Sequence, residues 1–294
     1  MSGALFDRVA LIGIGLIGSS LARVLRRDSK NTVIVACART AKTLEAVRRL
    51  NLADETTDDP AAAAASADLV VIATPLSAYA EIGRKIAPAL RPGAIVTDVG
   101  SVKGVVIREL APLLPAQVHF VPGHPVAGTE HSGPEAGFAE MFQDRWCILT
   151  PPPGTAPEAV QKVRAMWEMA GMRVVTMEAE HHDKVLAVTS HLPHLIAYTI
   201  VGTATELGED LQSEVVAYSA GGFRDFTRIA ASDPVTWRDI FLENREAVLE
   251  LLQRFSEDLT ALQRAIRRGD GETLYKWFTR TRAIRRSIIE AKQA

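Results

Sequence analysis

The feature that most constrains the fold is the sequence GIGLIG at residues 13–18. It directly follows an apolar run at residues 8–13, which is typical of a buried parallel strand, and it opens a helix-forming stretch at 16–27. A G-x-G-x-x-G pattern between a strand and a helix is typical of a turn that holds the pyrophosphate of a dinucleotide against a helix N-terminus. The sequence therefore predicts a dinucleotide-binding unit here, and a plain strand–turn–helix is the alternative.

Each residue of that turn has its own predicted role. Gly13 allows the tight turn, Gly15 lets the backbone approach a pyrophosphate, and Gly18 lets the helix pack closely on the strand. Leu16 and Ile17 begin the helix, so their backbone N–H groups are expected at the same cofactor site.

Short apolar runs typical of strands alternate with helical stretches over the first part of the chain. The predicted strands span residues 8–13, 32–38, 68–74, 94–99, 118–122, 146–150 and 173–177. Alternating strands and helices imply right-handed crossovers, and hence an α/β fold with a doubly wound, mostly parallel sheet of the Rossmann type.

The pattern changes near Met177, after which no convincing strand is found. Helices are predicted over residues 179–207, 212–220, 234–266 and 271–292. We place a boundary at residue 178, which gives a dinucleotide-binding domain at 1–178 and an all-helical domain at 179–294. Two domains fit a length of 294 residues, and helices with one apolar face predict a two-fold homodimer.

Composition excludes several other classes of protein. The formal net charge is −2, which argues against a nucleic-acid partner. Two cysteines, Cys37 and Cys147, fit no metal-ligand spacing and no disulfide framework. No secretory signal and no uninterrupted apolar run of about 18 residues is found, so we expect a cytoplasmic protein without a membrane partner.

The residues after the second predicted strand bear on the choice of cofactor. An acidic residue there would bond the ribose 2′-hydroxyl of NAD, but the sequence has Arg39, Thr40 and Lys42 instead. Arg39 pairs well with a 2′-phosphate, Thr40 can donate a hydrogen bond and Lys42 adds charge, so we expect NADP to be preferred. The alternative is that Arg39 stacks on adenine without selecting, which leaves NAD open.

Two motifs follow strands at the edge where open α/β sheets bind ligands. Ser101 lies in DVGSVKG (98–104), and the alternative is that Ser101 only caps a helix and that Lys103 is a surface charge. His124 lies in GHPVAGTEHSG (123–133). A neutral imidazole accepts a proton near neutral pH, so His124 is a candidate general base for oxidation of an alcohol.

Two motifs of the helical part offer polar side chains to a ligand. SHLPH at 190–194, with the histidines at 181–182, invites a metal reading, but a proline interrupts it and no HExxH is present. We expect it to line a cleft between the domains and to bind no metal. GGFRDFTR at 221–228 places Arg224 and Arg228 four residues apart, which suits a carboxylate; the alternative is a helix start with Arg224 paired to its acidic neighbour.

Together these motifs resemble the prephenate/arogenate dehydrogenase family of tyrosine biosynthesis. The resemblance covers most of the chain and rests on several motifs in the family's order: GIGLIGSSLAR, DVGSVKG, GHPVAGTEHSGPEAGF, DKVLAVTSHLPH and GGFRDFTRIAASDPVTWRDIFLEN. It implies a dinucleotide-binding domain followed by a helical dimerisation domain. It also implies NAD(P)-dependent oxidative decarboxylation of prephenate, arogenate or both as small-molecule substrates.

The resemblance also implies roles for particular residues. His124 looks like the catalytic histidine that takes the proton of the ring C4 hydroxyl, with Ser101 as its partner there. Arg228 is similar to the arginine that binds a substrate carboxylate. Further positions that match the substrate pocket are His194, Thr129, Glu130 and Trp237. Trp237 matches a residue that the neighbouring subunit contributes near the cleft.

Two other classes of protein remain as alternatives. A β-hydroxyacid or 6-phosphogluconate-type dehydrogenase shares the domain order but uses a lysine of the helical domain, and Lys184 is the only early candidate. A nucleotide-sensing protein would need no base such as His124. No residue distinguishes prephenate from arogenate, and the missing acid after the second strand departs from NAD-linked members of the family.

Overall fold

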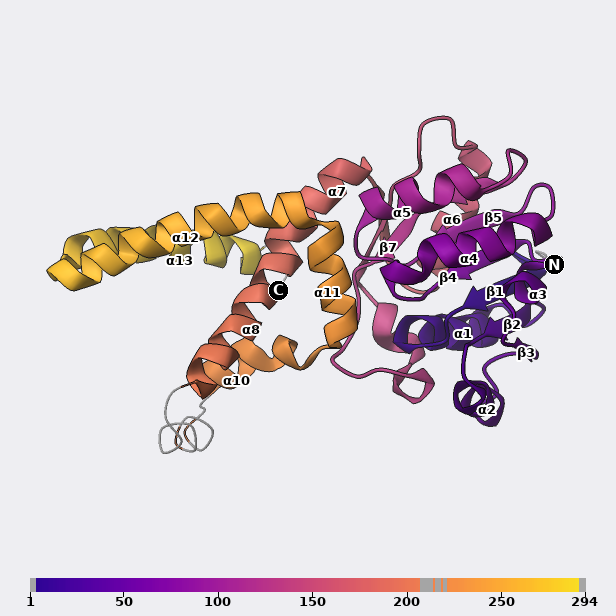
Figure 1. The fold of residues 1–294 in the computed structure, drawn as a ribbon, viewed down its shortest axis with the longest axis horizontal. Coiled ribbons are helices and arrows are strands. Elements are labelled where there is room, and N and C mark those ends of the chain that lie inside the picture. The colour runs from indigo at the N-terminus through magenta and orange to yellow at the C-terminus, as the bar shows by residue number, and fades with distance from the viewer. Residues whose placement is uncertain (1–3, 207–213, 215–217, 219–220, 291–294) are drawn as a thin grey trace. The chain divides into compact units, whose positions relative to one another are not determined.

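Six parallel strands form the main sheet, in the order β3-β2-β1-β4-β5-β6 (Figure 1). The computed structural model describes residues 4–206, 214, 218 and 221–290. The strands are β1 (Arg8–Ile12), β2 (Val33–Cys37), β3 (Glu55–Thr57), β4 (Leu69–Ile72), β5 (Ile95–Asp98) and β6 (His119–Val121). The strand order reverses between β1 and β4, and ligands of doubly wound sheets bind at the carboxyl ends of the strands at this point. The predicted fold class is confirmed.

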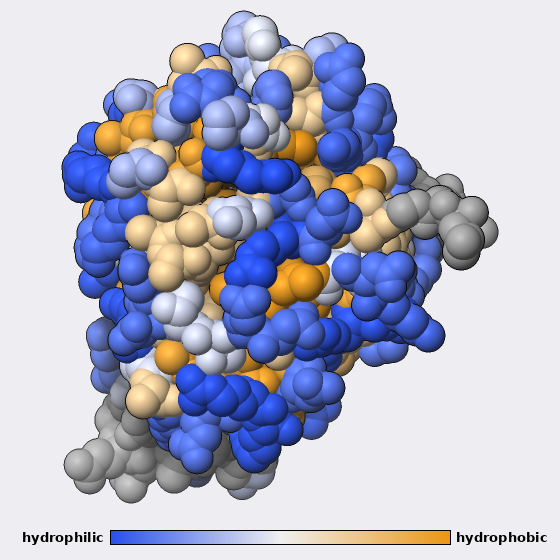
Figure 2. All heavy atoms as spheres, turned by 90° about the vertical axis from the view of Figure 1, so that its right-hand side faces the viewer, coloured by the Kyte–Doolittle hydropathy of each residue, from blue (hydrophilic) through white to orange (hydrophobic). Residues whose placement is uncertain are grey.

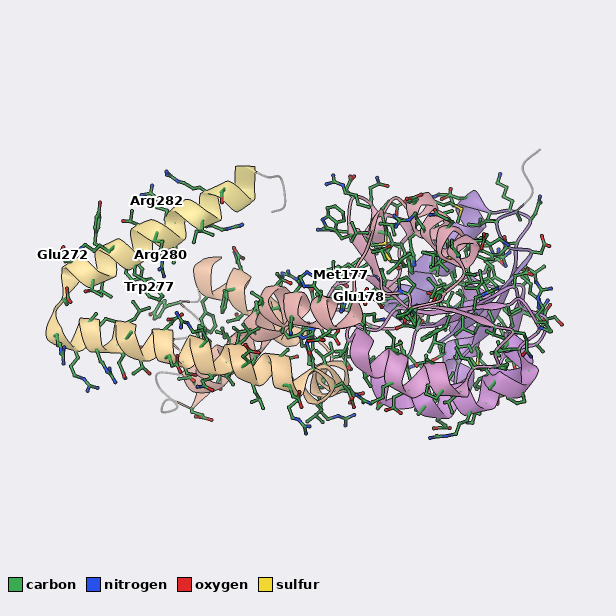
Figure 3. The ribbon with its side chains drawn as sticks, turned by 90° about the horizontal axis from the view of Figure 1, so that it is seen from above. Met177, Glu178, Glu272, Trp277, Arg280 and Arg282 are labelled. Atoms are coloured by element: carbon green, nitrogen blue, oxygen red, sulfur yellow. The ribbon has the colours of Figure 1, made fainter. Side chains whose placement is uncertain are left out.

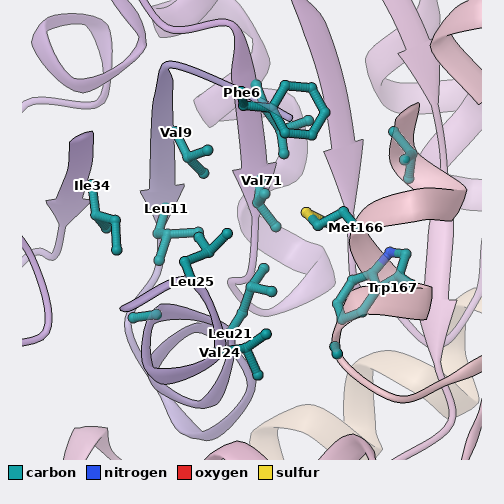
Figure 4. Close-up of a cluster of buried hydrophobic side chains, with 14 of the residues drawn as sticks. Phe6, Val9, Leu11, Leu21, Val24, Leu25, Ile34, Val71, Met166 and Trp167 are labelled. Atoms are coloured by element: carbon teal, nitrogen blue, oxygen red, sulfur yellow. The ribbon is translucent and has the colours of Figure 1, made fainter. Parts of the chain in front are cut away.

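Helices cover both faces of this sheet, because successive strand residues point to opposite sides. Val9 and Leu11 of β1 pack into one core with Leu21 and Trp167 (Figure 4). Ala10, the residue between them, belongs to a second core on the other face. The helices are α1 (Leu16–Asp28), α2 (Ala41–Arg49), α3 (Pro60–Ala64), α4 (Tyr79–Ile86), α5 (Lys103–Leu110) and α6 (Pro157–Met169).

A separate three-stranded sheet, in the order β7-β8-β9, carries part of the cavity lining. It consists of β7 (Gly123–Pro125), β8 (Trp146–Leu149) and β9 (Arg173–Thr176), with β7 antiparallel to β8. The strands predicted at 146–150 and 173–177 therefore exist, but the expectation that they extend the main sheet is wrong. β8 pairs with β7 and with β9, and none of the three pairs with β6, the edge strand of the main sheet.

Beyond Met177 every regular element of the described residues is helical, as predicted. The elements are α7 (Ala179–Leu186), a π-helical turn (Ala187–His191), α8 (Leu192–Thr205), α10 (Gly221–Thr227), α11 (Pro234–Glu243), α12 (Arg245–Arg268) and α13 (Gly271–Glu290). The helix predicted over 234–266 is divided at Asn244, whose backbone leaves the helical region. The helix predicted over 212–220 lies largely outside the described residues.

The chain forms two compact units, residues 1–245 and residues 246–294. The boundary predicted at residue 178 lies at Met177 and Glu178, which Figure 3 labels. It divides the chain by type of secondary structure and not by compactness, and it stays a prediction. The second unit holds α12 and α13, joined at Gly269, whose φ of +65° suits glycine. On α13 the Arg280 guanidinium lies over the Trp277 ring, 4.7 Å from its centroid (Figure 3).

The surface is mixed in character. On the face shown in Figure 2, hydrophilic residues predominate and apolar residues lie in small separate groups. One helical run of the described residues, Ala179–Thr205, is long and apolar enough to cross a membrane by length and composition alone. Only 22% of its most apolar window is buried. Most of the other apolar side chains of this run are partly buried, and Val188 is 52% exposed.

Candidate active site

A cavity of about 850 Å³ lies within the unit formed by residues 1–245. This volume is in the range of small-molecule sites in proteins. Most of the predicted site residues line it: Gly15, Leu16, Ile17, Ser101, His124, Thr129, Glu130, His194, Arg228 and Trp237. Gly13, Gly18, Arg39, Thr40 and Lys42 lie outside this lining. Residues far apart in the sequence are thus brought to one place.

The glycine turn fits the pyrophosphate of a dinucleotide. A Cβ on Gly13 would lie 2.3 Å from the Ala73 carbonyl oxygen, and one on Gly18 would lie 2.2 Å from the Gly13 carbonyl oxygen. A Cβ on Gly15 would meet no atom within 4 Å, and residues 15–17 face the cavity. The N-terminus of α1 has no side-chain cap, so its free N–H groups are available to phosphate oxygens.

His124 occupies the middle of β7, where its backbone pairs with Ile148 of β8. Its side chain is 7% exposed, and its Nδ1 lies 2.8 Å from Nε2 of His182. The pKa of His124 lies well below its usual value, chiefly because burial disfavours the imidazolium, and His182 and Lys103 add to the effect. The ring is therefore neutral at pH 7 and able to accept a proton.

His182 continues into a further contact on α7. Its Nδ1 lies 2.8 Å from Oδ1 of Asp183. Asp183 in turn accepts the backbone N–H groups of Lys103 at 2.7 Å and Gly104 at 2.8 Å, so it caps the N-terminus of α5. A histidine and a carboxylate thus link the cavity to a helix of the main domain.

Lys103 is fully buried, so the alternative of a surface charge is wrong. Its Nζ donates to Oδ2 of Asp98 and to the Gly123 carbonyl oxygen, both at 2.6 Å. Asp98 also accepts the Gly123 N–H at 3.1 Å. Burial lowers the pKa of Lys103, and Asp98 opposes that effect. The pair fixes the residue that directly precedes His124 in β7.

Ser101 lies at the cavity wall with no hydrogen-bond partner for its hydroxyl within the described residues. The N-cap of α5 is Val102, so the alternative that Ser101 only caps a helix is wrong. A hydroxyl that neither caps nor pairs is available to a ligand.

Two pairs of side chains shape the remaining wall of the cavity. Arg228 donates to Oε2 of Glu130 at 3.0 Å. Trp237 stacks on His194, with ring centroids 3.5 Å apart and an interplanar angle of 20°. Nδ1 of His194 lies 2.9 Å from the Ser190 carbonyl oxygen and therefore donates to it. Trp237 of this same chain lines the cavity; a contribution from a neighbouring subunit stays a prediction.

Arg224 does not join Arg228 at the cavity. Its Nε lies 3.7 Å from Oδ1 of Asp225, and its side chain is 76% exposed. The predicted carboxylate site of two arginines is therefore wrong for Arg224, because Arg224 lies outside the cavity lining. The alternative of a local pair with Asp225 holds for this residue.

The residues predicted to choose the cofactor lie at the carboxyl end of β2. Thr40 is the N-cap of α2, and its hydroxyl accepts the Thr43 N–H at 3.2 Å. Arg39 and Lys42 are exposed, and the first turn of α2 contains no acidic residue. Arg39 and Lys42 thus place two exposed cations beside the carboxyl end of β2.

Spacing in the sequence did not reveal the partners of His124. His182 lies 58 positions from His124, so the motif around His124 does not predict their contact. The one available signal was the HHD triplet beside the SHLPH motif. Among the described residues no group of three or more His, Cys, Asp or Glu is arranged to hold a metal ion.

A doubly wound sheet, a glycine turn and a neutral imidazole on one cavity define a class, the nicotinamide-dependent oxidoreductases. Comparison with known proteins narrows the class. Residues 21–176 match the family model described as prephenate dehydrogenase, nucleotide-binding domain, and residues 178–280 match prephenate dehydrogenase, dimerization domain. The chain belongs to the prephenate dehydrogenase family.

Individual relatives agree with this assignment. A cyclohexadienyl dehydrogenase of Zymomonas mobilis is 43% identical over 96% of both chains. Prephenate dehydrogenase of A. aeolicus, solved with hydroxyphenyl propionate and NAD+, has a TM-score of 0.89 at 36% identity, over 96% of this chain and 98% of that one. Synechocystis arogenate dehydrogenase has a TM-score of 0.78 at 28% identity, over 95% and 98%. The protein is thus an NAD(P)-dependent enzyme of oxidative decarboxylation, acting on prephenate, arogenate or both, and the β-hydroxyacid and sensor alternatives are not favoured.

Proposed function

We propose that His124 is the catalytic base of this reaction and that Ser101 assists it at the substrate hydroxyl. The observation that carries the proposal is a buried, neutral imidazole on the wall of the cavity that the glycine turn also lines. A base of this kind accepts the proton of an alcohol as the carbon is oxidised. Arg228, His194, Thr129, Glu130 and Trp237 would hold the substrate.

The steps balance with the residues at hand. A nicotinamide cofactor held at the glycine turn would supply the acceptor for the hydride of ring C4. His124 removes the proton of the C4 hydroxyl, and Ser101 holds the oxygen in reach. The ring carboxylate leaves as CO₂ and its bonding electrons enter the ring, which becomes aromatic. Arg228 would orient a carboxylate that is retained, because a cation on the departing carboxylate would hold its charge in place.

We also propose that NADP is preferred over NAD. Arg39 and Lys42 are exposed at the carboxyl end of β2, where NAD-binding turns carry an acid. Arg39→Asp would replace the cation with the missing acid. We expect kcat/KM with NADP to fall. We also expect the ratio of kcat/KM with NAD to kcat/KM with NADP to rise. A clear NAD preference in the unaltered protein would remove this part of the proposal.

The proposal has three further parts. The chain divides into domains 1–178 and 179–294, it forms a homodimer, and its location is cytoplasmic. The incompletely buried apolar run Ala179–Thr205 and the match to a dimerisation-domain model support a second copy of this chain as its cover. Light scattering on the purified protein would give twice the mass of 31.8 kDa for a dimer.

One assay tests the central proposal. The purified protein is incubated with prephenate and with arogenate, each with NAD and with NADP, and nicotinamide reduction is followed. Turnover that His124→Asn abolishes supports the assignment. Full turnover by that variant would remove His124 from its role. The four rates of the unaltered protein rank both substrates and both cofactors.

A further inference from the structure

A line of three side chains runs from the cavity into the protein behind His124. Nδ1 of His124 lies 2.8 Å from Nε2 of His182, and Nδ1 of His182 lies 2.8 Å from Oδ1 of Asp183. His124 and His182 are buried, and Asp183 is 9% exposed. The rings of His124 and His182 meet edge to face, with an interplanar angle of 63°. A buried line of this kind has few ways to place its protons.

The backbone of α5 fixes the starting point of that line. Asp183 accepts the N–H groups of Lys103 and Gly104 on its two oxygens. Both contacts require a carboxylate that acts as an acceptor, and the free N–H groups of a helix N-terminus favour its negative charge. Asp183 is therefore an anion that accepts a hydrogen bond from Nδ1 of His182.

The remaining protons follow by elimination. A neutral histidine that donates from Nδ1 has a lone pair on Nε2. His182 therefore accepts at Nε2, and the group that donates to it is Nδ1–H of His124. A neutral His124 protonated at Nδ1 has its own lone pair on Nε2, the nitrogen without a partner among the described residues.

We propose that His182 and Asp183 are positioning residues that hold His124 in the Nδ1–H tautomer, with Nε2 free to take the substrate proton. The inference rests on the proposed role of His124 as the base. The proposal adds no covalent step. The proton moves from the C4 hydroxyl to Nε2 of His124, and the hydrogen bond from Nδ1–H of His124 to Nε2 of His182 remains in place.

The charges around the line explain why it needs an anion. The groups that face His124 are His182 on α7, Lys103 on α5 and His191 on the π-helical turn, and each disfavours a positive charge on it. Asp98 is engaged by Lys103. Asp183 is thus the carboxylate to which His124 is connected when it becomes an imidazolium, and His182 makes that connection.

Two substitutions of His182 separate the halves of the line. In His182→Gln the amide oxygen occupies about the place of Nε2, so it can still accept from His124. In His182→Asn the amide occupies about the place of Nδ1, so it can contact Asp183 but not His124. His181→Asn is the matched control, because His181 is the exposed neighbour on the same helix.

We expect His182→Asn to lower kcat roughly 100-fold with KM within about twofold, since loss of a residue that orients a catalytic histidine costs up to about 10⁴ in kcat. His182→Gln should retain kcat within about tenfold, and His181→Asn should match the unaltered protein. Equal losses in both His182 variants, or a His182→Asn variant as active as the control, would overturn the proposal.

A second measurement needs neither turnover nor a variant. Long-range ¹H–¹⁵N spectra of the ring nitrogens, recorded without cofactor near pH 7, report the tautomer of each histidine. We expect His124 to be protonated at Nδ1 and bare at Nε2; the opposite tautomer or an imidazolium would contradict the proposal. If no substrate were turned over, the proposed function would fail while this spectrum still tested the tautomer.

Discussion

The environment of the buried His124 imidazole is determined by side chains from other segments more than by the residues of its own motif. Its place in GHPVAG and after a strand sufficed to predict a base near the ligand edge of the sheet. Its ring partner His182 and the nearby charge of Lys103 lie in other segments, and the spacing of a single sequence has no information on pairs 58 positions apart. Site residues within one motif were therefore predictable, and those defined by tertiary contact were not.

His124→Asn should lose most of kcat and leave KM nearly unchanged. A base acts in the transition state, and removing such a group costs about 10² to 10⁴ in rate. Steady-state kinetics with the preferred cofactor measure both constants. An unchanged kcat would show that another group takes the proton.

Arg228→Ala should act on the other constant. The guanidinium lies on the cavity wall, and its side chain is 60% exposed. In its proposed role it would bind a retained carboxylate in the ground state and the transition state alike, so its loss should raise KM about 10-fold or more. Arg224→Ala is the control, since Arg224 is exposed and paired with Asp225. Equal effects of the two variants would contradict a substrate role for Arg228.

At the scale of elements, the sequence predicted what local pattern determines. Apolar runs located β1, β2, β4, β5 and β6 to within a few residues. It missed β3, which is Glu-Thr-Thr with an exposed first residue, and β7, which is Gly-His-Pro. Each has only three residues and no apolar run, and each is a strand because a neighbouring strand pairs with it. The break at Asn244 was missed for a similar reason: its side chain bonds the Asp183 carbonyl oxygen and His191.

The first turn of the main sheet gives a prediction about glycine. Gly13→Ala combines a φ of +95° with a Cβ 2.3 Å from the Ala73 carbonyl oxygen, so it should lower stability by about 2 kcal/mol or more and abolish dinucleotide binding. Gly93→Ala has a φ of +79° but no atom near the new Cβ, so it should cost about 1 kcal/mol and leave binding intact. Denaturant unfolding and cofactor titration measure the two effects. Equal losses of stability and of cofactor binding in both variants would mean that the positive φ alone, and not the close approach to Ala73, explains why residue 13 is glycine.

At the scale of the whole molecule, the cavity is built from both sides of the predicted domain boundary at residue 178. β7 and Ser101 lie before it, and α7, α8 and α11 lie after it. All belong to the compact unit 1–245. The predicted boundary therefore separates segments of sequence that share one site, which is why neither segment read alone revealed the contacts of His124.

Buried neutral histidines make the stability of the molecule depend on pH. Burial lowers the pKa of His191 to about 4 from 6.5, and the pKa values of His124 and His182 are lowered too. A lowered pKa means that the unfolded chain binds more protons, so this stability is present above pH 6.5 and is lost as pH falls toward 4. Tm from thermal unfolding should therefore fall across this window, and less steeply in His191→Asn. A flat Tm over the window would contradict the burial of uncharged rings.

The stack of Trp237 on His194 has an optical consequence. An indole ring 3.5 Å from an imidazole is close enough for its excited state to be quenched, and the quenching grows when the imidazole gains a proton. Both rings stand on the cavity wall, so a molecule that enters changes the polarity around the indole. We therefore expect the emission of Trp237 to change when the cavity is occupied, without any added label.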